Sequence, residues 1–259
     1  MFSFEKLGKV FIENLDLIFS GLITTLLLAV IGTVIGLLLG ILLAYGKNIV
    51  IKKTDSKVRK IFKNIGLYFC KIYSAVFRGT PMMVQALIFK YLCQGLGFNW
   101  ELIQFPKEVS TILNGWLFAG LIVITLNTTA YMGEIIKSGL NGVDNGQIEG
   151  ALSLGMSKSQ ASILIILPQA IRNALPTIGN EFIVNIKDSS VLNIIAVAEL
   201  FYHFKDIATN SYAYLECYIL IACIYLVLTI LASMSIKIIE KKLDGDKLIV
   251  NIFSKKEDF

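Results

Sequence analysis

Polar side chains inside the apolar stretches of this chain are the residues whose types and spacing could do chemistry. Asn127, Tyr131 and Glu134 follow one another at intervals of four and three, which places them on one face of a helix. Gln85 and Asn180 lie in two other apolar stretches. Such groups suit a water-filled path for a polar solute, because polar side chains are costly against lipid. The alternative is hydrogen bonding between helices, which is common for Asn and Gln.

The stretch around Asn180 carries further polar residues. Thr177 and Lys187 share a helical face with Asn180, and Asn173 lies one turn earlier. These positions extend the candidate path to a second helix. For Lys187 and the adjacent Asp188, direct contact with a solute is the less favoured interpretation. We expect the two to form an ion pair that holds a break in the helix at its external end.

The sequence Arg78-Gly79-Thr80-Pro81 interrupts another apolar region. A proline lacks a backbone donor and bends a helix, so Pro81 predicts a break there. Arg78 could contact a carboxylate, or it could stabilise the carbonyl groups that the break exposes. Glu134 likewise has the alternative of lying at the cytoplasmic interface beside Lys137.

The sequence gives little support for a catalytic site or a metal site. His203 is the only histidine, and the acidic residues are scattered rather than clustered at catalytic spacing. The four cysteines show no CxxC pair and no metal-ligand spacing. The phosphate-binding pattern G-x-x-x-x-G-K-[ST] is absent. We therefore expect no catalytic residues, no metal, no cofactor and no ATP site in this chain.

The composition defines the elements that must position these residues. The 259 residues are 55% hydrophobic and 17% charged, whereas soluble domains are about 45–50% apolar and about 25% charged. Long uncharged runs predict an all-α polytopic membrane protein without room for a separate soluble domain. The net charge of +5 does not indicate nucleic acid, because the lysines gather at the ends of apolar runs.

The apolar runs predict five membrane spans. Residues 1–20 alternate apolar and charged positions and are expected to form an amphipathic helix along the membrane surface. In the first span, small residues recur every four positions, which favours close packing against another helix. A short amphipathic stretch is expected at 191–204, before the last span. The spans are expected at residues 22–45, 65–98 with the break at 78–81, 111–136, 163–186 and 212–236.

The lysine distribution predicts the orientation. The linker between the first two spans carries seven basic residues against the single acid Asp55, and the chain after Ile236 is also rich in lysine. Cytoplasmic segments carry such an excess of Lys and Arg. Five spans place both segments inside, with the N-terminus outside and the C-terminus inside. An even number of spans would separate the two segments.

The polar segment 146–158 has the form of a docking element. We expect a short helix over Gln147–Leu154, stopped by Gly155, and Ser157 as the N-cap of the next helix. A short helix in a cytosolic loop, with Ala151 and Leu152 available for contact, suits binding to another protein.

This segment resembles the EAA loop of ABC-transporter permeases, in the form E-A-A-x-x-x-G-x(9)-I-x-L-P. Three further segments resemble the subfamily that imports polar amino acids, the histidine, glutamine and arginine permeases. In this chain Gly150 replaces an alanine of the loop, Gly133 replaces Ala and Ser189 replaces Thr. The matching residues are Glu149-Gly150-Ala151, Gly155 and Ile165-x-Leu167-Pro168 in the loop, then Phe77-Arg78-Gly79-Thr80-Pro81 with Val84-Gln85, Ala130-Tyr131-Met132-Gly133-Glu134-Ile135, and Leu167-Pro168-Gln169-Ala170 through Asn180-Glu181-Phe182-Ile183 to Lys187-Asp188-Ser189-Ser190.

The resemblance implies a type I importer permease that transports polar amino acids across a prokaryotic cytoplasmic membrane. It implies a permease domain over 22–243, with its coupling loop at 146–168 and a cytoplasmic tail at 244–259. The implied partners are two separate ATP-binding subunits, a second permease subunit, identical or homologous, and an extracytoplasmic amino-acid-binding protein. Glu149, Gly150, Ala151 and Gly155 would contact the ATP-binding subunits.

A transporter driven by an ion gradient is the alternative function. It would need buried acids that bind protons or sodium, and often an internal repeat. The sequence shows no convincing repeat, and Glu134 and Asp188 both lie near span ends. Which amino acid is carried stays open.

Overall fold

The computed structural model describes residues 3–49, 53–103, 105–106, 110 and 112–254, with side chains up to residue 242. Helices are the only regular elements in this part of the chain. A π-helical turn, Ala161–Ile166, and a 3-10 segment, Ser189–Ile195, flank α8. A further 3-10 turn is Trp100–Leu102. The α-helices are α1 Phe4–Glu13, α2 Leu15–Lys47, α3 Lys57–Gly79, α4 Met82–Gly95, α5 Gly115–Asn141, α6 Asn145–Ser153, α7 Lys158–Gln160, α8 Leu167–Asp188, α9 Leu200–Ser211 and α10 Tyr214–Ser254.

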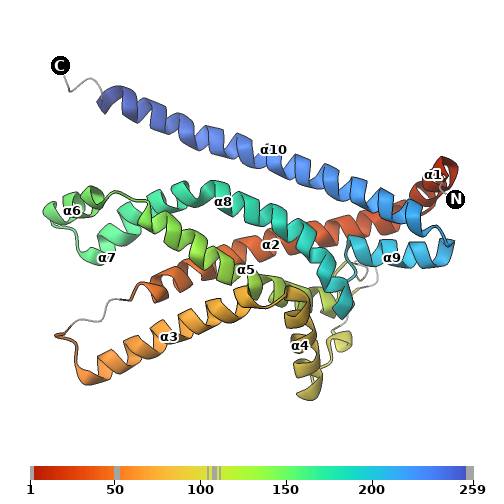
Figure 1. The fold of residues 1–259 in the computed structure, drawn as a ribbon, viewed down its shortest axis with the longest axis horizontal. Helices are drawn as coiled ribbons and strands as arrows, with labels where there is room; N and C mark the ends of the chain where they lie inside the picture. The colour runs from red at the N-terminus through yellow and green to blue at the C-terminus, as the bar shows by residue number, and fades with distance from the viewer. Residues whose placement is uncertain (1–2, 50–52, 104, 107–109, 111, 255–259) are drawn as a thin grey trace.

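Four stretches of the described chain are long and apolar enough to cross a membrane: Leu15–Lys47, Gly115–Asn141, Lys158–Ile195 and Tyr214–Lys242. Figure 1 shows that α2, α5 and α8 lie together, with α3 and the long α10 on either side of them. The end of α2, the start of α3, α6 and the last turns of α10 lie toward one end of the molecule, whereas α1 and α9 lie at the other.

The contact between α2 and α5 explains the small residues of the first span. Gly32, Gly36 and Gly40 face α5, where a methyl group added at Gly36 would lie 2.7 Å from the Thr128 side chain. Larger residues on α2 would therefore separate the two helices. The expectation that this stripe serves close packing is confirmed.

The break at Pro81 is confirmed, since α3 ends at Gly79 and α4 begins at Met82. Neither helix is among the four long apolar stretches. α3 is not among them because it is charged and strongly amphipathic. It carries Lys57, Lys60, Lys63, Lys71 and Arg78.

Several boundaries differ from the expected ones. The amphipathic helix α1 ends at Glu13 rather than near residue 20, and α2 begins at Leu15. α1 also packs against the rest of the protein, because its Val10 is buried against α9 and α10. Thr111, where the third span was expected to begin, Lys52 of the basic linker and residues 255–259 of the expected tail lie outside the described residues. α10 runs past the expected end of the last span at residue 236.

The α-helix ends at Asp188, which is where a break was expected. The chain continues from α8 directly into the 3-10 segment Ser189–Ile195. The direction changes later, at Ala196, whose φ of 69° is in the left-handed region. The expected amphipathic stretch 191–204 is therefore divided, and its second part belongs to α9. α9 begins at Leu200 because Glu199 accepts hydrogen bonds from the backbone N–H groups of Phe201 and Tyr202.

Candidate functional site

The break between α3 and α4 is stabilised by two amide side chains. Gln85 Nε2 donates to the carbonyl oxygens of Phe77 and Thr80, each at 2.9 Å. Asn127 Nδ2, from α5, donates to the Phe77 oxygen at 3.3 Å and to Gln85 Oε1 at 3.0 Å. Asn127 is buried, with 8% exposure. In this structure the two amides therefore satisfy carbonyl groups that the proline leaves without helical partners.

Arg78, for which contact with the exposed carbonyls was one expectation, makes a different set of contacts. Its guanidinium Nη1 lies 3.3 Å from Glu134 Oε1, and it lies over the Tyr131 ring at 5.7 Å. Lys47 from the end of α2 also forms an ion pair with Glu134. Ser74 Oγ donates to the same carboxylate at 3.3 Å. Glu134 thus joins α2, α3 and α5.

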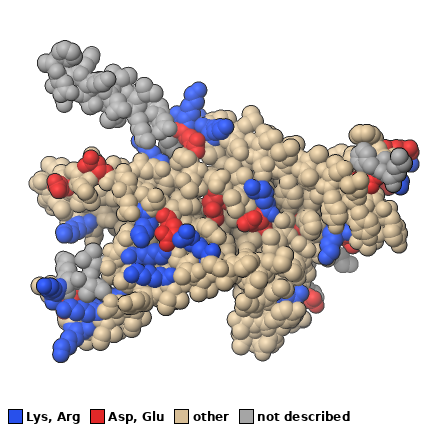
Figure 2. Space-filling model, viewed as in Figure 1, with Lys and Arg blue, Asp and Glu red and all other residues tan. Residues whose placement is uncertain are grey.

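A cavity of about 420 Å³ opens beside this carboxylate. Its charged lining comes from four basic side chains and one acid: Lys47, Lys71, Arg78, Lys137 and Glu134. Figure 2 shows Lys, Arg, Asp and Glu side chains gathered on the face between α3 and α8. Glu134 and Lys137 therefore line one cavity, and the cavity has a clear excess of positive charge.

A second cavity, of about 490 Å³, adjoins the first at Glu134. It lies between α5 and α8, and its polar lining includes Ser138, Asn173 and Thr177. Asn180 lies further along α8 and is exposed. The predicted polar face of α8 therefore exists, and at Thr177 it meets the face of α5 that carries Glu134.

Lys187 and Asp188 do not form the expected ion pair, because the described residues show no salt bridge between their side chains. Lys187 is exposed on the same face of α8 as Asn180, and its carbonyl oxygen accepts from Ser190 Oγ at 2.6 Å. Successive residues of a helix point about 100° apart, which separates their side chains.

Sequence reasoning missed the buried polar contact that joins three of the long apolar helices. Asn185 Nδ2 on α8 donates to Thr33 Oγ1 on α2 at 2.8 Å, and Thr128 Oγ1 on α5 donates to Asn185 Oδ1 at 3.0 Å. All three residues are buried. Thr33 and Thr128 lie beside the small residues of the α2–α5 contact, which is the signal that could have found them.

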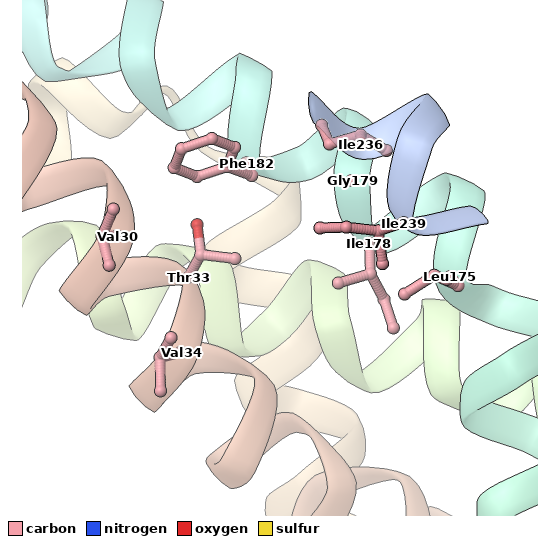
Figure 3. A pocket seen from close by; sticks show the side chains of 9 residues that line it. All are labelled: Val30, Thr33, Val34, Leu175, Ile178, Gly179, Phe182, Ile236 and Ile239. Carbon is pink, nitrogen blue, oxygen red and sulfur yellow. The ribbon is translucent and has the colours of Figure 1, made fainter. Parts of the chain in front are cut away.

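An apolar hollow of about 240 Å³ lies between α2, α8 and α10. Figure 3 shows its lining, which is apolar apart from Thr33. The Thr33 hydroxyl already accepts from Asn185. This hollow therefore offers little to a polar solute, and the candidate path is the polar surface of α5 and α8.

The segment expected to form a docking helix forms α6, one residue shorter at its end than predicted. Asp144 caps its start by accepting from Gly146 N at 2.6 Å. Gly155 has a φ of 81°, and its N–H donates to the Leu152 oxygen at 3.0 Å, which ends the helix. Ser157 is the N-cap of α7, as predicted, and it forms a capping box with Gln160.

The exposed surface of this loop differs from the expectation at one residue. Glu149 and Gly150 are exposed, but Ala151, expected to be available for contact, is buried with 6% exposure. Leu154 is 86% exposed and Ile148 is 38% exposed. Ala151 thus seats α6 on its own protein, and large apolar side chains beside it are left uncovered.

Comparison with known proteins identifies relatives along most of the chain. A family described as "Binding-protein-dependent transport system inner membrane component" matches residues 60–245. The probable amino-acid permease protein YxeN of Bacillus subtilis is 41% identical over 164 residues, which cover 63% of this chain and 68% of that protein. The arginine transport system permease protein ArtQ of Bacillus subtilis is 33% identical over 181 residues, 70% of this chain and 76% of that protein.

A solved structure described as an amino acid ABC transporter with histidines has a TM-score of 0.75 and 33% identity, and the match covers 93% of this chain and 99% of that one. The methionine ABC transporter MetNI in an inward-facing conformation has a TM-score of 0.61 at 16% identity, covering 88% of this chain and 95% of that one, which shows the fold alone. Nothing in these matches supports the ion-gradient alternative. The chain belongs to the family of inner membrane components of binding-protein-dependent transport systems, the permease subunits of ABC importers.

Proposed function

We propose that this chain forms the translocation path of an ATP-driven importer of polar amino acids in a prokaryotic cytoplasmic membrane. The observation that carries the proposal is the polar surface of α5 and α8, which lies in helices long and apolar enough to span a membrane. Relatives named as amino-acid, glutamine and arginine permeases support the substrate class.

In this proposal the path is lined by Tyr131, Asn180 and the residues of the cavity between α5 and α8. Asn180 is exposed and Tyr131 is half-buried, so both could meet a solute. Gln85 and Asn127 have their amides engaged with the helix break. We therefore assign them to shaping the wall of the path, together with Pro81, rather than to primary solute contact. Lys187 would lie at the external end of the same face, and Asp188 would lie next to it on a different face of the helix.

We propose five spans, with the N-terminus outside. The broken pair α3 and α4 supplies the fifth span, because α3 has 23 residues, enough to cross the hydrocarbon core. Its charged residues would then face water or protein rather than lipid. The basic linker, α6 and the last turns of α10 lie toward the same end of the molecule (Figure 1), which supports one cytoplasmic side.

We assign ATP hydrolysis to two separate ATP-binding subunits and substrate capture to an extracytoplasmic binding protein, with a second permease subunit completing the path. The α6 loop would dock on the ATP-binding subunits through Glu149, Gly150 and the exposed Leu154, while Ala151 and Gly155 hold its shape. Partner contact would cover apolar surface that is otherwise exposed, which is favourable.

The test is to purify the chain with its ATP-binding and binding-protein partners, reconstitute them in proteoliposomes and assay uptake of each common amino acid. Uptake should require ATP and the binding protein, and it should continue with ionophores present. Omitting the binding protein is the control. Uptake that follows a proton or sodium gradient without ATP would refute the proposal.

A further inference from the structure

The cavity beside Glu134 is lined by more positive than negative side chains. Four basic side chains line it against one carboxylate. Lys47 and Arg78 both bind that carboxylate, and the Lys47 side chain is only 5% exposed. Neither Lys71 nor Lys137 forms a salt bridge among the described residues. The cavity wall therefore carries a net charge of +3, and two of its cations, Lys71 and Lys137, have no carboxylate partner there.

These cations lie next to the polar cavity between α5 and α8. Glu134 lines both this cavity and the one between α5 and α8, so the two openings share a wall. Tyr131, one turn away on α5, lies under the Arg78 guanidinium. Lys47 is the last residue of α2, immediately before the basic linker. The positive cavity thus adjoins the proposed path at the end where the linker begins.

Such an arrangement selects a ligand by charge. A carboxylate binds well to ammonium and guanidinium groups, and the four cations present their charges from three different helices. Two unit charges about 7 Å apart interact by roughly 2 kcal/mol at an effective dielectric constant of 20. An anionic group is therefore attracted into the cavity, and a cationic side chain is repelled by a comparable amount.

We propose that this cavity is an anion-binding station at the cytoplasmic end of the path, which receives the α-carboxylate of the transported amino acid and disfavours cationic side chains. The inference rests on the proposed function and adds a substrate class to it: neutral polar or acidic amino acids rather than arginine or lysine. Lys71 and Lys137 hold the carboxylate. Glu134, already paired, fixes the positions of Lys47 and Arg78.

The first experiment measures the potential of the cavity without any transport. In the purified complex in nanodiscs, with the four native cysteines replaced, Ala75→Cys places a thiol on the cavity wall. Its rates with an anionic and a cationic methanethiosulfonate are compared with those of a free thiol. Taking the ratio of the two rates cancels any change in thiol pKa, since both reagents need the same thiolate.

We expect the ratio to favour the anionic reagent by about tenfold over the free thiol. The double variant Lys71→Gln/Lys137→Gln should remove most of this preference. Lys237→Gln, an exposed lysine of α10 outside the cavity, is the matched control and should leave the ratio unchanged. If Ala75→Cys fails to assemble, Gly79→Cys also lines the cavity, and an added side chain meets no atom within 4 Å there. A ratio equal to that of the free thiol would overturn the proposal.

The second experiment identifies the ligand. Millimolar glutamine should slow labelling at Ala75→Cys, whereas glutamine amide, which lacks the carboxylate, and arginine should not. Slowing that follows anionic phospholipid in the nanodisc and ignores glutamine would assign the cavity to a lipid headgroup and overturn the proposal.

Transport then separates the inference from the proposed function. The reconstituted importer should favour neutral or acidic amino acids over arginine, and Lys71→Gln/Lys137→Gln should narrow that preference. ATP-dependent uptake that prefers arginine would leave the proposed function intact and refute the charge selection.

Discussion

Asn127 on α5 donates a hydrogen bond of 3.0 Å to the side-chain oxygen of Gln85 on α4. Both amides also bind the Phe77 carbonyl at the helix break. Removing either amide should leave buried polar groups unpaired, which costs roughly 1–3 kcal/mol. We expect Asn127→Ala to lower the melting temperature of the purified complex clearly, with little change in the relative uptake rates of different amino acids. Altered selectivity at unchanged stability would instead show that Asn127 contacts the solute.

Asn180 should behave in the opposite way. It is exposed on α8, and the described structure gives its side chain no hydrogen bond. We expect Asn180→Ala to change the uptake rate or selectivity while leaving the melting temperature and subunit assembly unaltered. The affinity of the binding protein, measured separately by calorimetry, should be unaffected because that site is on another chain. A variant with a lower melting temperature but unchanged uptake rate and selectivity would show that Asn180 does not line the path.

Gly155 should be essential for coupling because of its backbone conformation. At its φ of 81° a side chain costs roughly 1–2 kcal/mol, so Gly155→Leu should distort the end of α6. We expect the variant to insert into the membrane but to lose uptake and binding-protein-stimulated ATPase activity. Gly8→Ala on α1, outside the docking loop, is the control: no atom lies within 4 Å of the added methyl group, and the helix gains up to ~1 kcal/mol. Normal coupled transport by Gly155→Leu would contradict the docking proposal.

The proposed orientation can be measured by cysteine labelling. Thr54 in the linker and Thr209 on α9 are both exposed. In a variant without native cysteines, an impermeant thiol reagent added to intact cells should label Thr209→Cys and not Thr54→Cys. Opening the cells should make Thr54→Cys reactive. Labelling of Thr54→Cys from outside would refute five spans with this orientation.

Glu199 should make stability depend on pH. Burial raises the pKa of this carboxyl to about 7, although hydrogen bonds from the Phe201 and Tyr202 backbone and from Tyr225 oppose the shift. The folded protein therefore holds a proton that the unfolded chain releases near pH 4.5. The resulting stability is present below pH 4.5 and is lost as the pH rises to 7.

The measurement is the melting temperature between pH 5 and pH 8 for the wild type and Glu199→Gln. Over this range the free energy of unfolding of the wild type should fall by up to roughly 3 kcal/mol more than that of the variant, and its melting temperature should fall accordingly. Glu101→Gln, which changes an exposed carboxylate, is the control and should follow the wild type. Identical pH profiles for the wild type and Glu199→Gln would show that Glu199 titrates equally in the folded and unfolded chain.

Local signals were sufficient for much of the fold. Pro81 predicted the break between α3 and α4 because a proline acts on its own helix, and Gly155 with Ser157 predicted the shape of the α6 loop for the same reason. The Gly32–Gly40 stripe predicted a close helix contact. These features depend on residues within one or two turns, which the sequence displays directly.

Other features required the tertiary structure, because they depend on which helices meet. The sequence placed Gln85 and Asn127 on different helices as candidate path residues. Only their contact shows that both amides serve the helix break. The sequence likewise left two possible contacts for Arg78, a carboxylate or the carbonyl groups at the helix break. The approach of α5 to α3 brings it to the carboxylate of Glu134.

The amino-acid sequence by itself determined an all-helical membrane protein, the family resemblance and the residues of the α6 loop, because hydropathy and motif spacing act locally along the chain. The tertiary structure decided that Lys47, Lys71, Arg78 and Lys137 surround one carboxylate, although their positions span 91 residues of sequence numbering from first to last. Electrostatic interactions act through space, so the charge of a cavity emerges only when α2, α3 and α5 pack together.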